Sequence, residues 1–155
     1  MEQMANIQNV DVAGEDKQYI VIKIGDESYG IDINYVDNIV RNQRITRIPK
    51  AQPYFKGVIN LRGEIIPVMS LRLKFDLEPD TYTNATRIII IKLESQSAIG
   101  LIVDEVKEVV TLNEEVIEKN TTADLSDEKS QYLSGIGKHE DNLISLLNIA
   151  AVIAE

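Results

Sequence analysis

The residue types in this chain that could carry chemistry are few. Its only histidine, His139, stands directly before Glu140 and Asp141, a combination that could serve acid–base catalysis or metal binding. Three adjacent residues of an expected turn do not converge on one ion as zinc ligands do. A histidine in an exposed turn is usually just solvated, so this cluster does not predict a site.

Three further carboxylates follow expected strands, where catalytic acids can lie: Asp32, Asp104 and Glu105. Acids at strand ends more often form turns or caps. The chain has no cysteine, and it contains no Gly-rich phosphate loop, nucleophile elbow or zincin motif. We therefore expect no catalytic residue, no cofactor and no metal. A small hydrolase or metal-dependent enzyme using Asp32, Asp104 or His139 is kept as the alternative to a binding protein.

An arginine at a hairpin tip is the other residue of interest. Arg62 lies between the apolar runs of "GVINLRGEIIPVMSL", and Gly63 after it permits a positive φ and a tight turn. The residues expected to build the structural turn of this hairpin are Gly57, Asn60 and Gly63. Arg62 has two competing roles, a clamp that bonds nearby carbonyls or an acid, and a direct contact to a partner. The clamp with a secondary contact is favoured.

Composition narrows the class of protein. The 155 residues are 44% hydrophobic and 26% charged, as in a globular domain. No apolar run reaches the roughly 18 residues of a spanning helix, and the N-terminus lacks a signal-peptide pattern, so a cytoplasmic location is expected. The net charge of −9 argues against nucleic-acid binding.

The basic residues are unevenly placed. Residues 41–74 hold eight of the sixteen basic residues and only one of the 25 acids, Glu64. Such a segment is either a solvated face or a positive patch that steers an acidic protein partner. The second reading is favoured because the remaining surface must be strongly negative.

The elements expected to position these residues are mostly strands. A polar leader covers residues 1–16. "QYIVIKIGDESYGIDI" alternates around a turn and predicts a hairpin, and Asn34 is expected to cap a short helical turn carrying Val36, Ile39 and Val40. "TRIIIIKL" predicts a strand buried on both faces, turned by "ESQS". A strand with a long acidic loop, a hairpin at "YLSGIGKHEDNLISLL" and a short C-terminal helix follow.

The two halves of the chain resemble each other. Residues 30–40 align without a gap on residues 100–110, and "GVINLRGEIIPVMSL" resembles "GIGKHEDNLISLLNI". Each half is therefore predicted to be the same β-rich unit, with approximate subdomains at 17–76 and 86–155 and a connector at 77–85. Several short strands with regular turns favour small barrels, and cores this small should share one apolar layer.

Four stretches carry a resemblance to a known family. "GDESYGIDINYVDNIV", "TRIP", "FKGVINLRGEIIPVMSLRLKF" and "GLIVDEVKEVV" resemble the CheW family of chemotaxis coupling proteins, from about Lys17 to the C-terminal helix. One departure is Ser70, where the family commonly has aspartate. The resemblance implies a mainly β fold: two five-stranded SH3-like barrels that share a hydrophobic core, with short helices and a C-terminal helix.

The resemblance also implies a function without catalysis. Such proteins bind the regulatory domain of the histidine kinase CheA and the helical tips of methyl-accepting chemoreceptors, and so cluster with membrane receptors without inserting into the membrane. The same module serving another receptor–kinase pathway, such as surface motility, is the alternative within the family. Receptor-binding residues carried over are Val36, Asn38, Ile39, Arg62, Val106 and Val109. The valines among them could instead be simple core residues.

Overall fold

A computed structural model describes residues 14–93, 97–119 and 131–154. The leader up to residue 13, most of the expected "ESQS" turn and the acidic loop at 120–130 lie outside the described residues. The elements in chain order are β1 (Asp16–Ile24), β2 (Glu27–Asp32), η2 (Ile33–Tyr35), β3 (Val36–Arg41), β4 (Phe55–Leu61), β5 (Glu64–Ser70), α2 (Leu71–Lys74), β6 (Arg87–Ile91), β7 (Ile99–Val103), β8 (Glu105–Asn113), η3 (Glu114–Val116), β9 (Ile117–Lys119), β10 (Leu133–His139), β11 (Asn142–Leu147) and α3 (Ile149–Ile153). Asp16, expected in the leader, is thus the first residue of β1.

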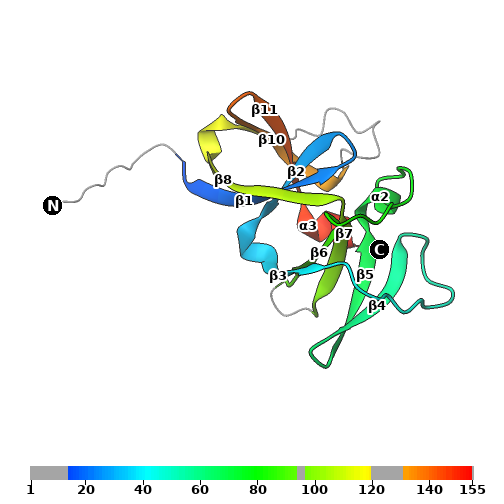
Figure 1. Ribbon diagram of the computed structural model, residues 1–155. Helices are drawn as coiled ribbons and strands as arrows, with labels where there is room; N and C mark the ends of the chain where they lie inside the picture. The colour runs from blue at the N-terminus through cyan, green and yellow to red at the C-terminus, as the bar shows by residue number, and fades with distance from the viewer. Residues whose placement is uncertain (1–13, 94–96, 120–130, 155) are drawn as a thin grey trace.

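The strands form two sheets built on one plan (Figure 1). One sheet has the order β3-β6-β7-β5-β4 and the other β8-β1-β2-β11-β10-β9. Each contains one parallel pair at the same place: Val68 of β5 lies beside Gly100 of β7, and Leu146 of β11 lies beside Gly30 of β2. These four residues are related by the two alignments found in the sequence, so the internal repeat is confirmed.

The sheets interleave the two halves of the chain. The hairpin β1–β2 joins the sheet that contains β8 to β11, whereas the hairpin β6–β7 joins the sheet that contains β3 to β5. Each sheet therefore draws strands from both 17–76 and 86–155. Those two ranges mark the repeats in the sequence, and neither range coincides with one sheet.

The apolar residues fall into three clusters because the strands alternate. Ile88 and Ile90 point into the interior of the five-stranded sheet, while Ile89 and Ile91 point into a cluster shared by both sheets. This confirms the prediction of a strand buried on both faces. In β1, Val21 joins the interior cluster of the other sheet, and the alternate isoleucines join the shared cluster. The shared apolar layer is the one predicted.

The expected helical turn at Val36–Val40 is wrong. Residues 33–35 form one 3₁₀ turn whose cap is Asp32, which accepts a hydrogen bond from the Asn34 amide (2.9 Å), and β3 follows. A register shift in β3 between Val36 and Asn38 brings Val36 and Ile39, three residues apart, opposite Ile91 and Ile89 on one face, so the helix-like spacing did not separate the two structures. The β-branched side chains of this segment and its hydrogen-bonded pairing with β6 favour the strand over the helix.

The five-stranded sheet closes on itself through an isolated bridge. Thr46 and Val58 exchange two backbone hydrogen bonds of 2.8 Å each, which joins the chain after β3 to β4 at the far edge. Gly57, expected in the hairpin turn, lies instead in β4 at a register shift, with φ at 140°. In the other sheet the strands at the two ends of the order, β8 and β9, follow each other in the chain, and η3 links them. The fold is thus a pair of small barrels sharing one core.

Candidate protein-binding surface

Two exposed apolar residues lie on the edge strands of different sheets. Ile39 of β3 is 36% exposed and Val109 of β8 is 50% exposed. Ile39 lies opposite Ile89, and Val109 lies opposite Ile20. Residues directly opposite on antiparallel strands share one face, and both partners belong to the shared cluster. Ile39 and Val109 therefore extend the face of the shared apolar layer to its exposed margins.

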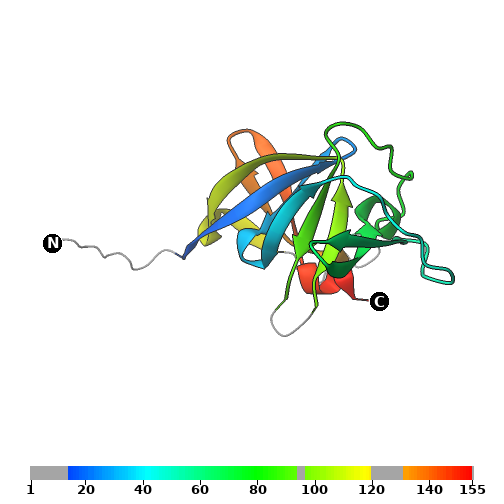
Figure 2. The same ribbon diagram turned by 60° about the horizontal axis from the view of Figure 1, so that its bottom comes forward.

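Val36 and Val106 lie deeper on the same two strands. Val36 pairs with Ile91 and Val106 pairs with Ile22, again residues of the shared cluster. Both valines are half-buried and pack against that cluster. In both views β3 runs alongside the β1–β8 pair (Figures 1 and 2). We call Val36, Asn38, Ile39, Val106 and Val109 the β3–β8 surface.

The sequence left two roles open for the valines, packing in the core and contact with a partner. The structure shows a different degree of burial for each of them. Val36 and Val106 have a packing role as well as a place on the surface, whereas Val109 is too exposed to be simple core. Asn38 is half-buried, and its Oδ1 accepts a hydrogen bond from the Ile39 amide (2.8 Å). That bond satisfies a backbone donor on β3, which pairs with only one other strand of the sheet.

Arg62 does not act as the expected clamp. It has φ at 52° at the tip of the β4–β5 hairpin, and its side chain is exposed. Within the described part of the chain its guanidinium has no hydrogen-bond or ion-pair partner. The turn is held instead by Asn60, whose Oδ1 accepts a hydrogen bond from the Gly63 amide (3.0 Å). Arg62 is thus a residue of the β4–β5 hairpin tip and does not belong to the β3–β8 surface, which is made by residues of β3 and β8.

The basic segment divides into engaged and exposed side chains. Arg72 forms an ion pair with Asp104. The Lys74 ammonium lies 4.0 Å from the centroid of the Tyr54 ring and donates a hydrogen bond to the Ala154 carbonyl (2.7 Å). The exposed members are Arg41, Arg44, Arg47, Lys50 and Arg62, and Lys56 is half-buried.

Two of the three strand-end acids have structural partners. Asp32 caps η2, and Asp104 accepts hydrogen bonds from the Gly25 amide (2.8 Å) and from Arg72. The Arg72 hydrogen bond lowers the pKa of the Asp104 carboxyl. Glu105 is an exposed first residue of β8. His139 Nε2 lies 3.8 Å from the neighbouring Glu140 carboxylate, and the described residues hold no cluster of three or more metal-ligating side chains.

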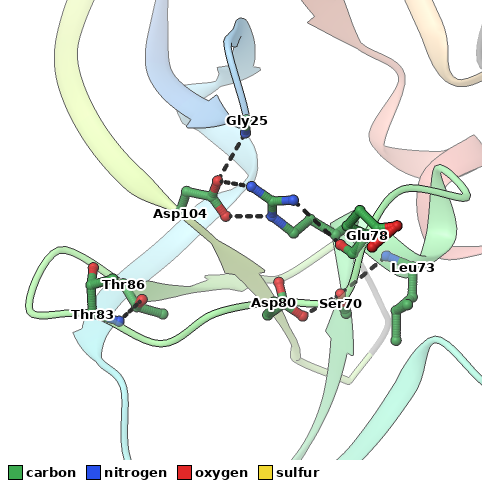
Figure 3. A network of polar contacts seen from close by, with 9 residues as sticks. Gly25, Ser70, Leu73, Glu78, Asp80, Thr83, Thr86 and Asp104 are labelled. Carbon is green, nitrogen blue, oxygen red and sulfur yellow. Dashed lines mark hydrogen bonds and ion pairs between the residues drawn. The ribbon is translucent and has the colours of Figure 1, made fainter.

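Ser70 is the position where the family pattern commonly has an acid. Its side chain is buried beside the carboxylate of Asp80. Its hydroxyl donates to Asp80 Oδ2 (2.5 Å) and accepts from the Leu73 amide (3.1 Å), so it also caps α2 (Figure 3). Burial raises the pKa of Asp80, and the Ser70 hydrogen bond offsets part of that rise. The expected connector is thereby fastened to the first turn of α2.

Two functional candidates were missed in the sequence. Ile65 is 60% exposed and Leu143 is 67% exposed, and they occupy matching positions of the repeat, on the second strand of a hairpin with a two-residue turn. The alignment of the two hairpins already placed Ile65 over Leu143. What the sequence lacked was the direction of these side chains, which point outward while Ile66 and Ile144 are buried.

A repeated barrel pair with exposed apolar margins is typical of a protein-binding scaffold. Residues 18–155 match the CheW-like domain family, and the chain belongs to this family. It is 32% identical to the chemotaxis protein CheW of Klebsiella aerogenes over 97% of this chain and 92% of that protein. It is 35% identical to CheW of Helicobacter pylori over 88% and 81% of the two chains.

A solved structure has the same fold. The crystal structure of the scaffolding protein TtCheW from Thermoanaerobacter tengcongensis superposes with a TM-score of 0.76 at 36% identity, covering 86% of this chain and 90% of that chain. The mainly β two-barrel fold expected from the resemblance is confirmed. No helix among the described residues has the length and apolar character needed to cross a membrane.

Proposed function

We propose that this protein is a non-catalytic coupling protein of bacterial chemotaxis, which bridges the tips of chemoreceptors and a CheA-type histidine kinase in the cytoplasm. The observation that carries the proposal is the β3–β8 surface, where Ile39 and Val109 expose the margins of the shared apolar layer. An apolar margin supplied by two strands suits an amphipathic helix, which binds through residues spaced i, i+3 and i+4. The receptor-binding residues of the proposal are Val36, Asn38, Ile39, Val106 and Val109 on this surface, with Arg62 at the β4–β5 hairpin tip as a separate rim contact.

The kinase is proposed to dock on the two hairpins that carry Ile65 and Leu143. The regulatory domain of CheA is itself CheW-like, so one barrel can pack against another in a heterologous way. The two hairpins differ in charge, because Arg62 at one tip matches Glu140 at the other, both with positive φ. Each hairpin thus offers an exposed apolar residue beside a tip of a different sign, which supports two distinct kinase surfaces.

Capture of the kinase tests the function directly. The full chain, immobilised, should retain a CheA-type kinase from the native cell, and adding a receptor cytoplasmic fragment should change the autophosphorylation rate of that kinase. A chain that retains neither kinase nor receptor, under conditions where its fold is intact, would contradict the proposed function.

Leu143→Glu is expected to weaken binding of the kinase regulatory domain by at least about tenfold. The new carboxylate would lose its water in the contact and find no partner there. Substitutions at the centre of a contact typically reduce the binding free energy by about 2 kcal/mol or more. Folding stability should change by less than about 0.5 kcal/mol because Leu143 is largely exposed. Calorimetric titration would measure the affinity. Val116→Glu is the control, because Val116 is an exposed apolar residue (54%) in η3 outside both hairpins. An equal loss there would refute the assignment.

Arg62→Ala is expected to leave the free energy of unfolding within about 0.5 kcal/mol of the parent, because no described group depends on the guanidinium. If Arg62 is a rim contact for an acidic group of the receptor, its loss should slow association and flatten the dependence of that rate on salt. Stopped-flow association over a salt series measures both. The matched variant Asn60→Ala should instead lower stability by about 1 kcal/mol, since it removes the hydrogen bond to Gly63. Clear destabilisation by Arg62→Ala would restore the clamp.

A further inference from the structure

One carboxylate ties the two barrels together at an end of the shared layer (Figure 3). Asp104 Oδ1 accepts from Arg72 Nε (2.9 Å), and Oδ2 accepts from Arg72 Nη2 (2.5 Å) and from the Gly25 amide (2.8 Å). The Asp104 amide donates to the Lys23 carbonyl (3.1 Å). Such a two-bond fork between arginine and carboxylate fixes direction as well as distance.

The bonded residues come from elements of different sheets. Arg72 is in α2, which directly follows β5 of the five-stranded sheet, and Gly25 is in the turn between β1 and β2 of the other sheet. Asp104 lies where the chain leaves β7 in one sheet and enters β8 in the other. Its side chain and that of Arg72 are only 25% and 20% exposed, so water screens the pair less than it screens a surface ion pair.

The repeat lacks this contact at its second copy. The two alignments that relate the barrels place Asn34 at the position of Asp104 and Ala150 at the position of Arg72. Neighbouring features do repeat: the backbone amides of the caps Ser70 and Asn148 donate matching hydrogen bonds to the Tyr54 and Tyr132 carbonyls (2.8 Å each). The start of β8 is therefore fastened by a charged fork, whereas an alanine cannot fasten the start of β3 in this way.

We propose that Arg72 and Asp104 are positioning residues for receptor binding, which hold the start of β8 so that Val106 and Val109 form the fixed margin of the β3–β8 surface. Val106 is only two residues beyond Asp104 and pairs with Ile22, one residue before Lys23. The fork thus acts on β8 through both the chain itself and its neighbour β1. The opposite margin, on β3, is left to adjust to the bound helix. The inference rests on the proposed function.

Hydrogen exchange in the free protein tests the fastening. In Arg72→Met and in Asp104→Asn, the Gly25 amide and the amides at the start of β8 should exchange at least about tenfold faster, as expected when a charge-assisted hydrogen bond that closes a local unit is lost. The double variant should exchange no faster at the start of β8 than Asp104→Asn alone, because that variant already removes the Arg72 fork as well as the charge that accepts the Gly25 amide. Amides of β3 should not change. Unchanged exchange at Gly25 and β8 in both single variants would overturn the proposal.

Receptor binding is the second measurement, made with the full chain and a helical-hairpin fragment of a chemoreceptor tip. Both single variants should bind this fragment about tenfold more weakly than the parent, through the loss of a prearranged margin. The matched control is Lys74→Met in the same helix, whose ammonium contacts Tyr54 and Ala154 instead and which should bind normally. Faster exchange with parental affinity would overturn the positioning role alone. A parent chain that binds no receptor fragment would overturn the proposed function and the positioning role with it.

Discussion

Replacing Gly57 with alanine is expected to lower the free energy of unfolding by about 3 kcal/mol or more, the range of substitutions that combine backbone strain with a steric collision. Gly57 has φ at 140°, which L-residues rarely adopt. An added Cβ would overlap the Thr46 carbonyl oxygen and lie 2.7 Å from its carbonyl carbon and 2.9 Å from Arg47 Cα. All three are backbone atoms, so the strand itself must shift.

The shift would act on the closure of the barrel. Thr46 exchanges two backbone hydrogen bonds with Val58, the residue after Gly57, and this bridge is what joins the chain after β3 to β4. Urea unfolding followed by circular dichroism should show a lower midpoint for Gly57→Ala. If this variant does not fold, expression in the soluble fraction with a lost near-ultraviolet signal reports the same result.

Gly63→Ala provides the matched control. Gly63 also has a positive φ, 88°, but a Cβ there would meet nothing within 4 Å. Gly63→Ala should therefore lower the free energy of unfolding only through the unfavourable backbone conformation of alanine, by about 1 kcal/mol. Equal losses at Gly57 and Gly63 would mean that backbone conformation, and not the collision with Thr46, sets the requirement for glycine.

Much of the fold could be predicted because the central strands are continuous runs of β-branched residues, which indicate burial on both faces. The run Ile88–Ile91 has an isoleucine on both faces, which is chemically sensible only for a strand between two apolar layers, and the structure has the barrel interior on one side and the shared layer on the other. The internal repeat could also be predicted, because residues with special packing recur in both halves. Val68 and Leu146 lie beside glycines of a neighbouring strand in each barrel, and a Cβ on Gly100 or Gly30 would collide with the packing there.

The interleaving of the halves could not be read from the sequence. Strand pairing between distant segments leaves no local pattern, since β6 satisfies its alternation equally well beside β3 as beside β5. Local spacing likewise failed at Val36–Val40, because a register shift in β3 puts Val36 and Ile39 on one face and so mimics helical spacing, while Val40 packs into the interior of its own sheet. Pairing with β6 gives this segment its hydrogen bonds and settles the choice.

The candidate site was partly readable. The resemblance supplied Val36, Ile39, Val106 and Val109, and the repeat related the two pairs, but only the registers show that they extend one apolar layer. Arg62 was expected to hold its turn because arginine has the donors to do so. Asn60, with a shorter side chain three residues before Gly63, has the better geometry for that amide.

Val109→Asp is expected to reduce binding of a chemoreceptor tip at least about 100-fold, because an unpaired carboxylate in an apolar contact costs several kcal/mol. Val109 is preferable to Val36 for this test. Val36 is half-buried against the shared cluster, so a charge there would also destabilise the fold. Val109 is 50% exposed on an edge strand, where the loss of strand propensity amounts to about 1 kcal/mol at most.

The matched control is Thr111→Asp, two residues farther along the same strand and on the same face. Thr111 is exposed and lies opposite Gln18, outside the shared cluster, so this variant adds the same charge to β8 without entering the apolar margin. It should bind within about threefold of the parent, which allows for weaker long-range steering by an already acidic protein. Ile39→Asp, on the opposite margin, should repeat the loss seen with Val109→Asp, since one helix lying across the layer contacts both strands. A folded Val109→Asp protein with parental affinity would show that the helix does not use this margin. Loss with Ile39→Asp alone would then place the contact on β3, and would leave the fastened edge of β8 without its proposed partner.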